Sequence, residues 1–116
     1  MGTAVSIELA ADRPDPELHA MIADVCGWLH EVDARFSTYR DDSEVSRMRR
    51  GELTSTDCHP DLRHVLGACA DLWRATDGYF DAYYGGVLDP SGYVKGWAVA
   101  EASRRLVTAG CGTHYI

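Results

Sequence analysis

Residues 76–97 constrain this chain most, because they form a glycine-rich crossover between two helical patterns. This segment holds five glycines, three acidic residues, one lysine and six aromatic residues. Glycine lets the backbone approach a ligand closely, and charged side chains beside aromatic rings suit a ligand with a flat ring and a charged tail. The residues alone leave an alternative, a tyrosine- and glycine-rich hairpin that only joins the two helices.

Hydrophobic periodicity predicts the elements before the crossover. Alternating apolar residues predict a half-buried strand over residues 3–11. Apolar residues at helical spacing predict a helix over residues 16–35, with Asp15 as its N-cap. A short helix follows, for which we expect Asp41 as the N-cap and Gly51 as the stop.

The second half of the chain continues this helical pattern. After a polar connection, the apolar spacing predicts a helix over residues 60–75 whose buried stripe includes Trp73. A helix over residues 96–109 and a strand over residues 113–116 follow the crossover. Helices dominate and the strands are few, so we expect part of an α+β domain.

Length and charge restrict the class of protein. The 116 residues are one domain or part of one. The net charge of −7 argues against a nucleic-acid partner or an anionic membrane surface. No apolar run reaches the length of a membrane-spanning helix and no signal peptide is visible, so we expect a cytoplasmic protein. The four cysteines include no C-x-x-C pair, which disfavours a zinc site.

Several motifs, in a fixed order, resemble one protein family. T-D-G-Y-F-D at residues 76–81 and L-D-P-S-G-Y-V-K-G-W-A at residues 88–98 resemble the flavin-binding core of the FAD:protein FMN transferases, the ApbE family. Three further motifs precede these two, also in family order: M-G-T at residues 1–3, F-S-T-Y-R at residues 36–40 and D-S-E-V-S-R at residues 42–47. The resemblance covers nearly all of this chain and about the first half of the family's domain. It implies that residues 1–116 are the N-terminal part of a single ApbE-like domain.

The resemblance also implies a ligand site. It makes the carbonyl of Gly92 a magnesium ligand, and hard cations do prefer oxygen. A lysine near the positive end of a helix indicates an anionic neighbour. For Tyr39 the residues alone favour a buried aromatic, whereas the resemblance places it against the flavin. The implied FAD contacts are Met1, Tyr39, Tyr79, Phe80, Asp81, Asp89 and Lys95.

The implied reaction is magnesium-dependent transfer of FMN from FAD to a threonine or serine hydroxyl of a target flavoprotein. The family's other magnesium ligands lie in the second half of its domain, so we expect no turnover by this chain alone, and no catalytic residue is assigned. A non-catalytic flavin-binding module and a truncated remnant without function are the alternatives. One position departs from the family: Arg49 occupies the place of the asparagine in S-R-x-N.

Overall fold

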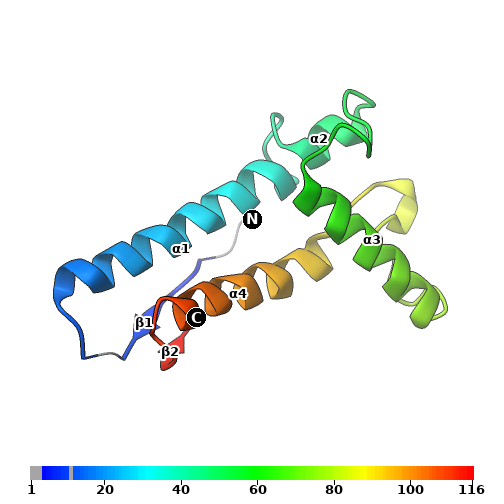
Figure 1. Ribbon diagram of the computed structural model, residues 1–116. Helices are drawn as coiled ribbons and strands as arrows, with labels where there is room; N and C mark the ends of the chain where they lie inside the picture. Colours follow the sequence, from blue (N-terminus) through cyan, green and yellow to red (C-terminus); the bar gives the residue numbers. More distant parts are fainter. Residues whose placement is uncertain (1–3, 11) are drawn as a thin grey trace.

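The computed structural model describes residues 4–10 and 12–116, without the side chain of Tyr84. Over these residues the chain forms four α-helices, a short 3-10 turn and a two-stranded sheet (Figure 1). This mixed helical structure with a small sheet is compatible with the expected α+β class. The radius of gyration is 16.1 Å, larger than the value of about 13 Å for a compact domain of this length. The structure is therefore elongated.

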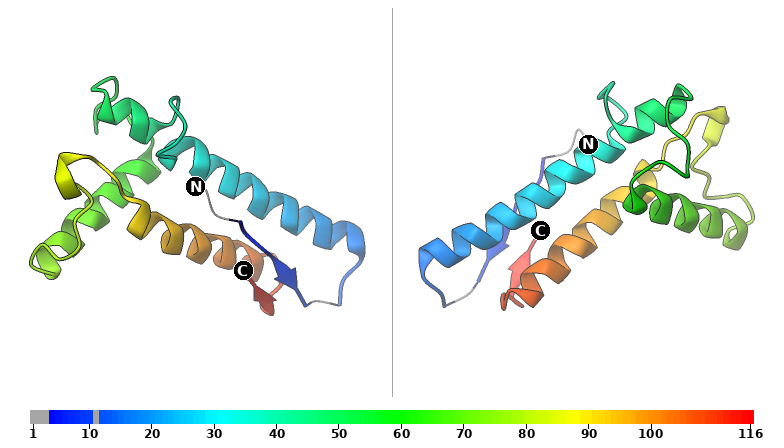
Figure 2. Two further views of the ribbon diagram at one scale, coloured as in Figure 1. Left: turned by 180° about the vertical axis from the view of Figure 1, so that it is seen from behind. Right: turned by 45° about the horizontal axis from the view of Figure 1, so that its top comes forward.

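The long arm of the molecule consists of α1 (Asp15–Phe36) and α4 (Ser91–Thr108), which run antiparallel side by side (Figures 1 and 2). The indole of Trp28 donates a buried hydrogen bond of 3.0 Å to the carbonyl of Ala98. The ring of Trp97 packs edge-on against both Trp28 and Phe36, at centroid distances of 5.2 and 5.5 Å. These contacts fix where the C-terminal end of α1 meets the N-terminal end of α4.

The sheet consists of β1 (Glu8–Leu9) and β2 (His114–Tyr115), which pair antiparallel. The amide of Ala10 adds one bond to the carbonyl of Thr113. The strand predicted over residues 3–11 is therefore too long, because the ladder extends only where β2 offers a partner. Residues 3 and 11 lie outside the described residues.

The shorter helices α2 (Glu44–Arg49) and α3 (Pro60–Ala75) lie at the far end of α1. The prediction for α3 is confirmed, and Gly51 ends α2 with a φ of +75° as expected. The predicted caps are wrong. Ser43, not Asp41, caps α2, because its hydroxyl accepts from the amide of Ser46. Helix α1 begins at Asp15 itself, one residue early, with Pro14 in the N-cap position.

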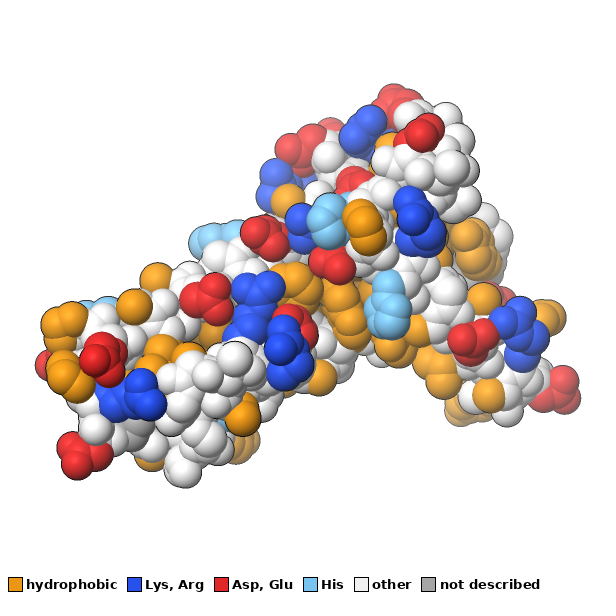
Figure 3. Space-filling view, in the orientation of Figure 1, with side chains coloured by type: hydrophobic (Ala, Val, Ile, Leu, Met, Phe, Trp, Pro, Cys, Tyr) orange, Lys and Arg blue, Asp and Glu red, His pale blue; other side chains and the backbone are white. Residues whose placement is uncertain are grey.

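Helix α4 begins at Ser91, five residues before the predicted start. The carbonyl of Pro90 accepts from the amides of Tyr93 and Val94, which nucleates the helix there. The connection between α2 and α3 has no strand. None of the helices in the described part of the chain combines the length and apolar character needed to cross a bilayer. On the face in Figure 3, acidic and basic side chains are interspersed, and hydrophobic ones gather where α1, α3 and α4 meet.

Candidate functional site

A cavity of about 210 Å³ lies where α1 ends and α4 begins. It brings together three of the predicted ligand contacts, Tyr39, Asp89 and Lys95. These residues come from the turn after α1, the segment before α4 and the second turn of α4. The other residues that line it are Phe36, Ser37, Thr38 and Ser91.

Tyr39 is positioned by a buried serine. The hydroxyl of Ser37 accepts hydrogen bonds of 3.1 Å from the amides of both Tyr39 and Arg40. The carbonyl of Ser37 in turn accepts from the hydroxyl of Ser43 at 2.6 Å. The Tyr39 side chain is 81% exposed, so the alternative of a buried aromatic is wrong. Its ring is free to stack on a ligand.

Asp89 is held as an ionised acceptor beside the cavity. Its amide donates to the carbonyl of Ala82 at 2.7 Å, and one carboxylate oxygen accepts from the amide and the hydroxyl of Ser91. The hydroxyl of Ser91 lowers the pKa of Asp89 most, with smaller contributions from the Ser91 amide and the charge of Arg49. The carboxylate is therefore charged at neutral pH and can accept a hydrogen bond from a ligand hydroxyl.

Lys95 is the only lysine of the sequence, and it is exposed at the rim of the cavity. Within the described residues its ammonium group makes no hydrogen bond or ion pair. The first turn of α4 carries no acidic residue. A cation so close to the positive end of a helix is unfavourable unless an anion lies nearby. Asp89 lines the same cavity and Asp33 lines a neighbouring one with Lys95, but Lys95 pairs with neither, so its ammonium group is available to an anionic or hydroxyl-bearing ligand.

The other predicted contacts lie elsewhere on the crossover. Tyr79 is 96% exposed. Phe80 is partly buried, and its ring lies 3.4 Å from the position that a β-carbon on Gly92 would take. The carboxylate of Asp81 accepts from the amide of Tyr83 at 2.8 Å. Tyr79, Phe80 and Asp81 therefore do not line the cavity next to α4. Met1 lies outside the described residues.

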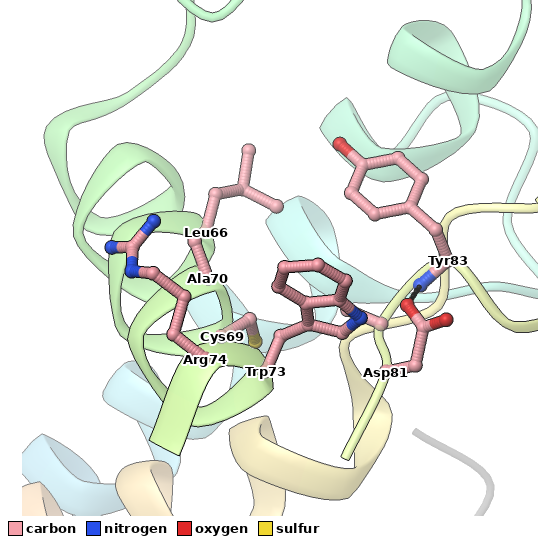
Figure 4. A pocket seen from close by; sticks show the side chains of 8 residues that line it. Leu66, Cys69, Ala70, Trp73, Arg74, Asp81 and Tyr83 are labelled. Carbon is pink, nitrogen blue, oxygen red and sulfur yellow. Dashed lines mark hydrogen bonds between the residues drawn. The ribbon is translucent and has the colours of Figure 1, made fainter. Parts of the chain in front are cut away.

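Asp81 lines a second, larger cavity of about 420 Å³, between α3 and the crossover. Figure 4 shows the indole of Trp73 between Leu66 of α3 and Tyr83 of the crossover. Trp73 is 51% exposed, so its predicted place in the buried stripe is wrong. The stripe fails there because Trp73 lies in the last turn of α3, where its ring faces this cavity and not the packed core.

The described residues hold one predicted magnesium ligand, the carbonyl of Gly92. They contain no cluster of three or more histidine, cysteine, aspartate or glutamate side chains that could hold a metal ion. Gly92 lies in the first turn of α4 rather than in a loop, where the helical pattern uses its carbonyl as an acceptor. A magnesium ion bound to this carbonyl would complete its octahedral shell with waters, phosphate oxygens or further side chains.

Arg49 is a further functional candidate. In the sequence it is noted only as a departure from the family's asparagine in S-R-x-N. Its Nε donates a hydrogen bond of 2.6 Å to the carbonyl of Leu88. This bond ties the end of α2 to the segment that carries Asp89. An arginine can reach across this gap because its side chain is longer than that of asparagine.

A comparison with known families supports the resemblance to the ApbE family. The described residues form a mostly helical structure with a small sheet, compatible with the α+β class, and a small polar and aromatic cavity. The model of the ApbE family matches residues 1–89, and the chain belongs to this family. The match includes Tyr39 and the crossover up to Asp89, whereas Gly92 and Lys95 lie beyond it. No curated protein and no solved structure matches this chain.

Proposed function

We propose that this chain is the N-terminal part of a single FAD:protein FMN transferase domain and that it binds FAD. The complete activity would be magnesium-dependent transfer of FMN to a threonine or serine hydroxyl of a target flavoprotein. One observation supports the proposal above all. Two family motifs that are far apart in the sequence supply Tyr39, Asp89 and Lys95 to one cavity.

Each of the three residues has a role that fits a dinucleotide. The exposed ring of Tyr39 stacks on the flavin. The ionised carboxylate of Asp89 accepts from a ribose hydroxyl, and Lys95 donates to a hydroxyl or phosphate oxygen. The cavity of about 210 Å³ accommodates only part of FAD, since whole drug-sized ligands occupy about 300–1,000 Å³. Tyr79, Phe80 and Asp81 are the proposed contacts for the remainder.

The transfer reaction needs groups beyond this cavity. The acceptor hydroxyl attacks the phosphorus on the FMN side, the pyrophosphate bond breaks, AMP leaves and a base takes the hydroxyl proton. Magnesium is expected to neutralise charge on the phosphates, and the Gly92 carbonyl is one proposed ligand. We assign to the described residues the binding of FAD, and the group that takes the proton stays unassigned.

FAD binding is tested by calorimetric titration of FAD into the chain, with and without magnesium. Lys95→Gln should weaken binding at least about tenfold, because a charge-assisted hydrogen bond contributes roughly 1.5–3 kcal/mol. Arg104→Gln is the matched control. It removes one positive charge from the same helix, where Arg104 pairs with Glu101 at 2.7 Å, and should bind FAD as the wild type does.

A second readout uses the single lysine. FAD should protect Lys95 from acylation by an amine-reactive ester, with the chain acylated in the absence of FAD as the reference. A folded chain that takes up no FAD, with Lys95 acylated equally in its presence and absence, would show that the proposal is wrong for this chain.

A further inference from the structure

A third cavity, of about 310 Å³, lies on the other side of the segment that carries Asp89. Its lining side chains include one cation, Arg49, and no carboxylate. The four other cavities described for this chain each include an aspartate: Asp81, Asp33, Asp24 and Asp89. A positive cavity is unusual in a chain whose net charge is −7. The remaining lining residues are Met48, Tyr83, Gly86, Val87 and Leu88.

The guanidinium of Arg49 is only partly used. Its Nε donates to the carbonyl of Leu88 at 2.6 Å, and its other N–H donors have no partner among the described residues. The neighbouring Arg50 differs, because both arms of its fork bind the carboxylate of Glu52, at 3.1 and 2.9 Å. The charge of Arg49 lowers the pKa of the nearby Asp89 carboxylate, but among the described residues Arg49 forms no ion pair with a carboxylate.

Arg49 is also not needed to cap α2. The amides of Arg50, Gly51 and Glu52 already donate to the last carbonyls of this helix, those of Ser46, Met48 and Arg47. The unused donors of Arg49 are therefore available to something outside the helix.

The crossover supplies Tyr83, Gly86, Val87 and Leu88 to the lining, and of these only Gly86 has no side chain. Gly85 and Gly86 have φ of +71° and +79°, and the space around both α-carbons is open, with nothing within 4 Å of a β-carbon built on either. Glycines in this conformation let a ligand approach the amides closely. The amide of Gly86 already donates to the carbonyl of Tyr83 at 2.8 Å, so the donor that this cavity offers to a phosphate oxygen is the planar guanidinium of Arg49.

We propose that this cavity binds a phosphoanion, with Arg49 as the anchoring cation. The cavity adjoins the one beside α4, since Leu88 lines the first and Asp89 the second. The diphosphate of FAD is one source of the phosphoanion, and in that form the inference rests on the proposed function. Free pyrophosphate is the other source, and it does not depend on FAD binding.

Inorganic pyrophosphate is the probe, titrated into the 116-residue chain by calorimetry without added metal. Arg49→Gln should weaken binding at least about tenfold, since the glutamine amide can still donate to Leu88 but carries no charge. Arg50→Gln is the matched control: it removes the same charge one residue away and should bind pyrophosphate as the wild type does. In the wild type, pyrophosphate should shift the amide resonances of Gly86 and Val87. This readout remains valid if Arg49→Gln fails to fold.

FAD and riboflavin, which lacks phosphate, distinguish the two sources. If Arg49→Gln weakens pyrophosphate and FAD but not riboflavin, the cavity takes the diphosphate of the dinucleotide. If it weakens pyrophosphate alone, the cavity takes a free phosphoanion, and the inference holds even when FAD does not bind. Equal pyrophosphate affinity in Arg49→Gln and the wild type, or unshifted Gly86 and Val87 amides, would overturn it.

Discussion

The hydroxyl of Ser43 donates a hydrogen bond of 2.6 Å to the carbonyl of Ser37, and both residues are almost completely buried. The same hydroxyl accepts from the amide of Ser46 and so caps α2. One side chain therefore joins the F-S-T-Y-R and D-S-E-V-S-R motifs and fixes the turn that presents Tyr39.

Ser43→Ala should destabilise the protein by about 1–2 kcal/mol, because it removes an N-cap and leaves the Ser37 carbonyl with one partner fewer. The melting temperature should fall by roughly 4 °C or more. Ser55→Ala is the control, since this exposed side chain makes no hydrogen bond in the described residues, and it should stay within about 0.5 kcal/mol of the wild type. Equal melting temperatures for the two variants would contradict the role of Ser43.

Two glycines should respond to alanine in opposite directions. Gly110 has a φ of +94° and its β-carbon would meet the Arg13 guanidinium, so Gly110→Ala should destabilise by about 1–2 kcal/mol. Gly67 lies inside α3 with open space around it, so Gly67→Ala should stabilise by about 0.5–1 kcal/mol. Urea unfolding measures both, and a shift of the same sign in the two variants would refute the comparison.

Substitution by phenylalanine should lower the free energy of unfolding more at Trp28 than at Trp73. Trp28→Phe should cost about 1–3 kcal/mol, because it removes the buried hydrogen bond to the Ala98 carbonyl and part of the contact between α1 and α4. Trp73→Phe should change stability by less than about 0.5 kcal/mol, since its ring is half exposed. Chemical denaturation tests both, and a larger loss for Trp73→Phe would show that its ring contributes to the core.

The pH dependence of stability should depend in part on Asp89. Its folded-state pKa is lowered, chiefly by the hydroxyl of Ser91, so its stabilising contribution is present above the unfolded-state pKa of about 3.9. That contribution is lost as the pH falls through the lowered folded-state value. The free energy of unfolding of the wild type minus that of Asp89→Asn should therefore be constant near neutral pH. Below about pH 4 this difference should fall, because the wild type loses the contribution of the ionised carboxylate. Thermal unfolding across pH 2–7 measures it, and a constant difference over the whole range would contradict the assignment.

The sequence by itself determined the family, through the order of its motifs, and the extents of the two most periodic helices. The structure has α1 over Asp15–Phe36 and α3 over Pro60–Ala75, within a residue of the predictions. Local signals suffice for these helices because their apolar residues repeat at helical spacing and a proline lies in the first turn of each.

Only the tertiary structure decided which side chains share a cavity. Tyr39, Asp89 and Lys95 meet because α1 and α4 pack together through Trp28 and Ala98. Asp81 faces a different cavity with Trp73, whose spacing predicted burial. The bond from Arg49 to Leu88 likewise joins residues 39 positions apart. The Ser43 cap and the early start of α4, in contrast, rest on local hydrogen bonds that the hydrophobic periodicity does not report. Periodicity along one segment describes which face is apolar, but it contains no information about what another segment places against that face.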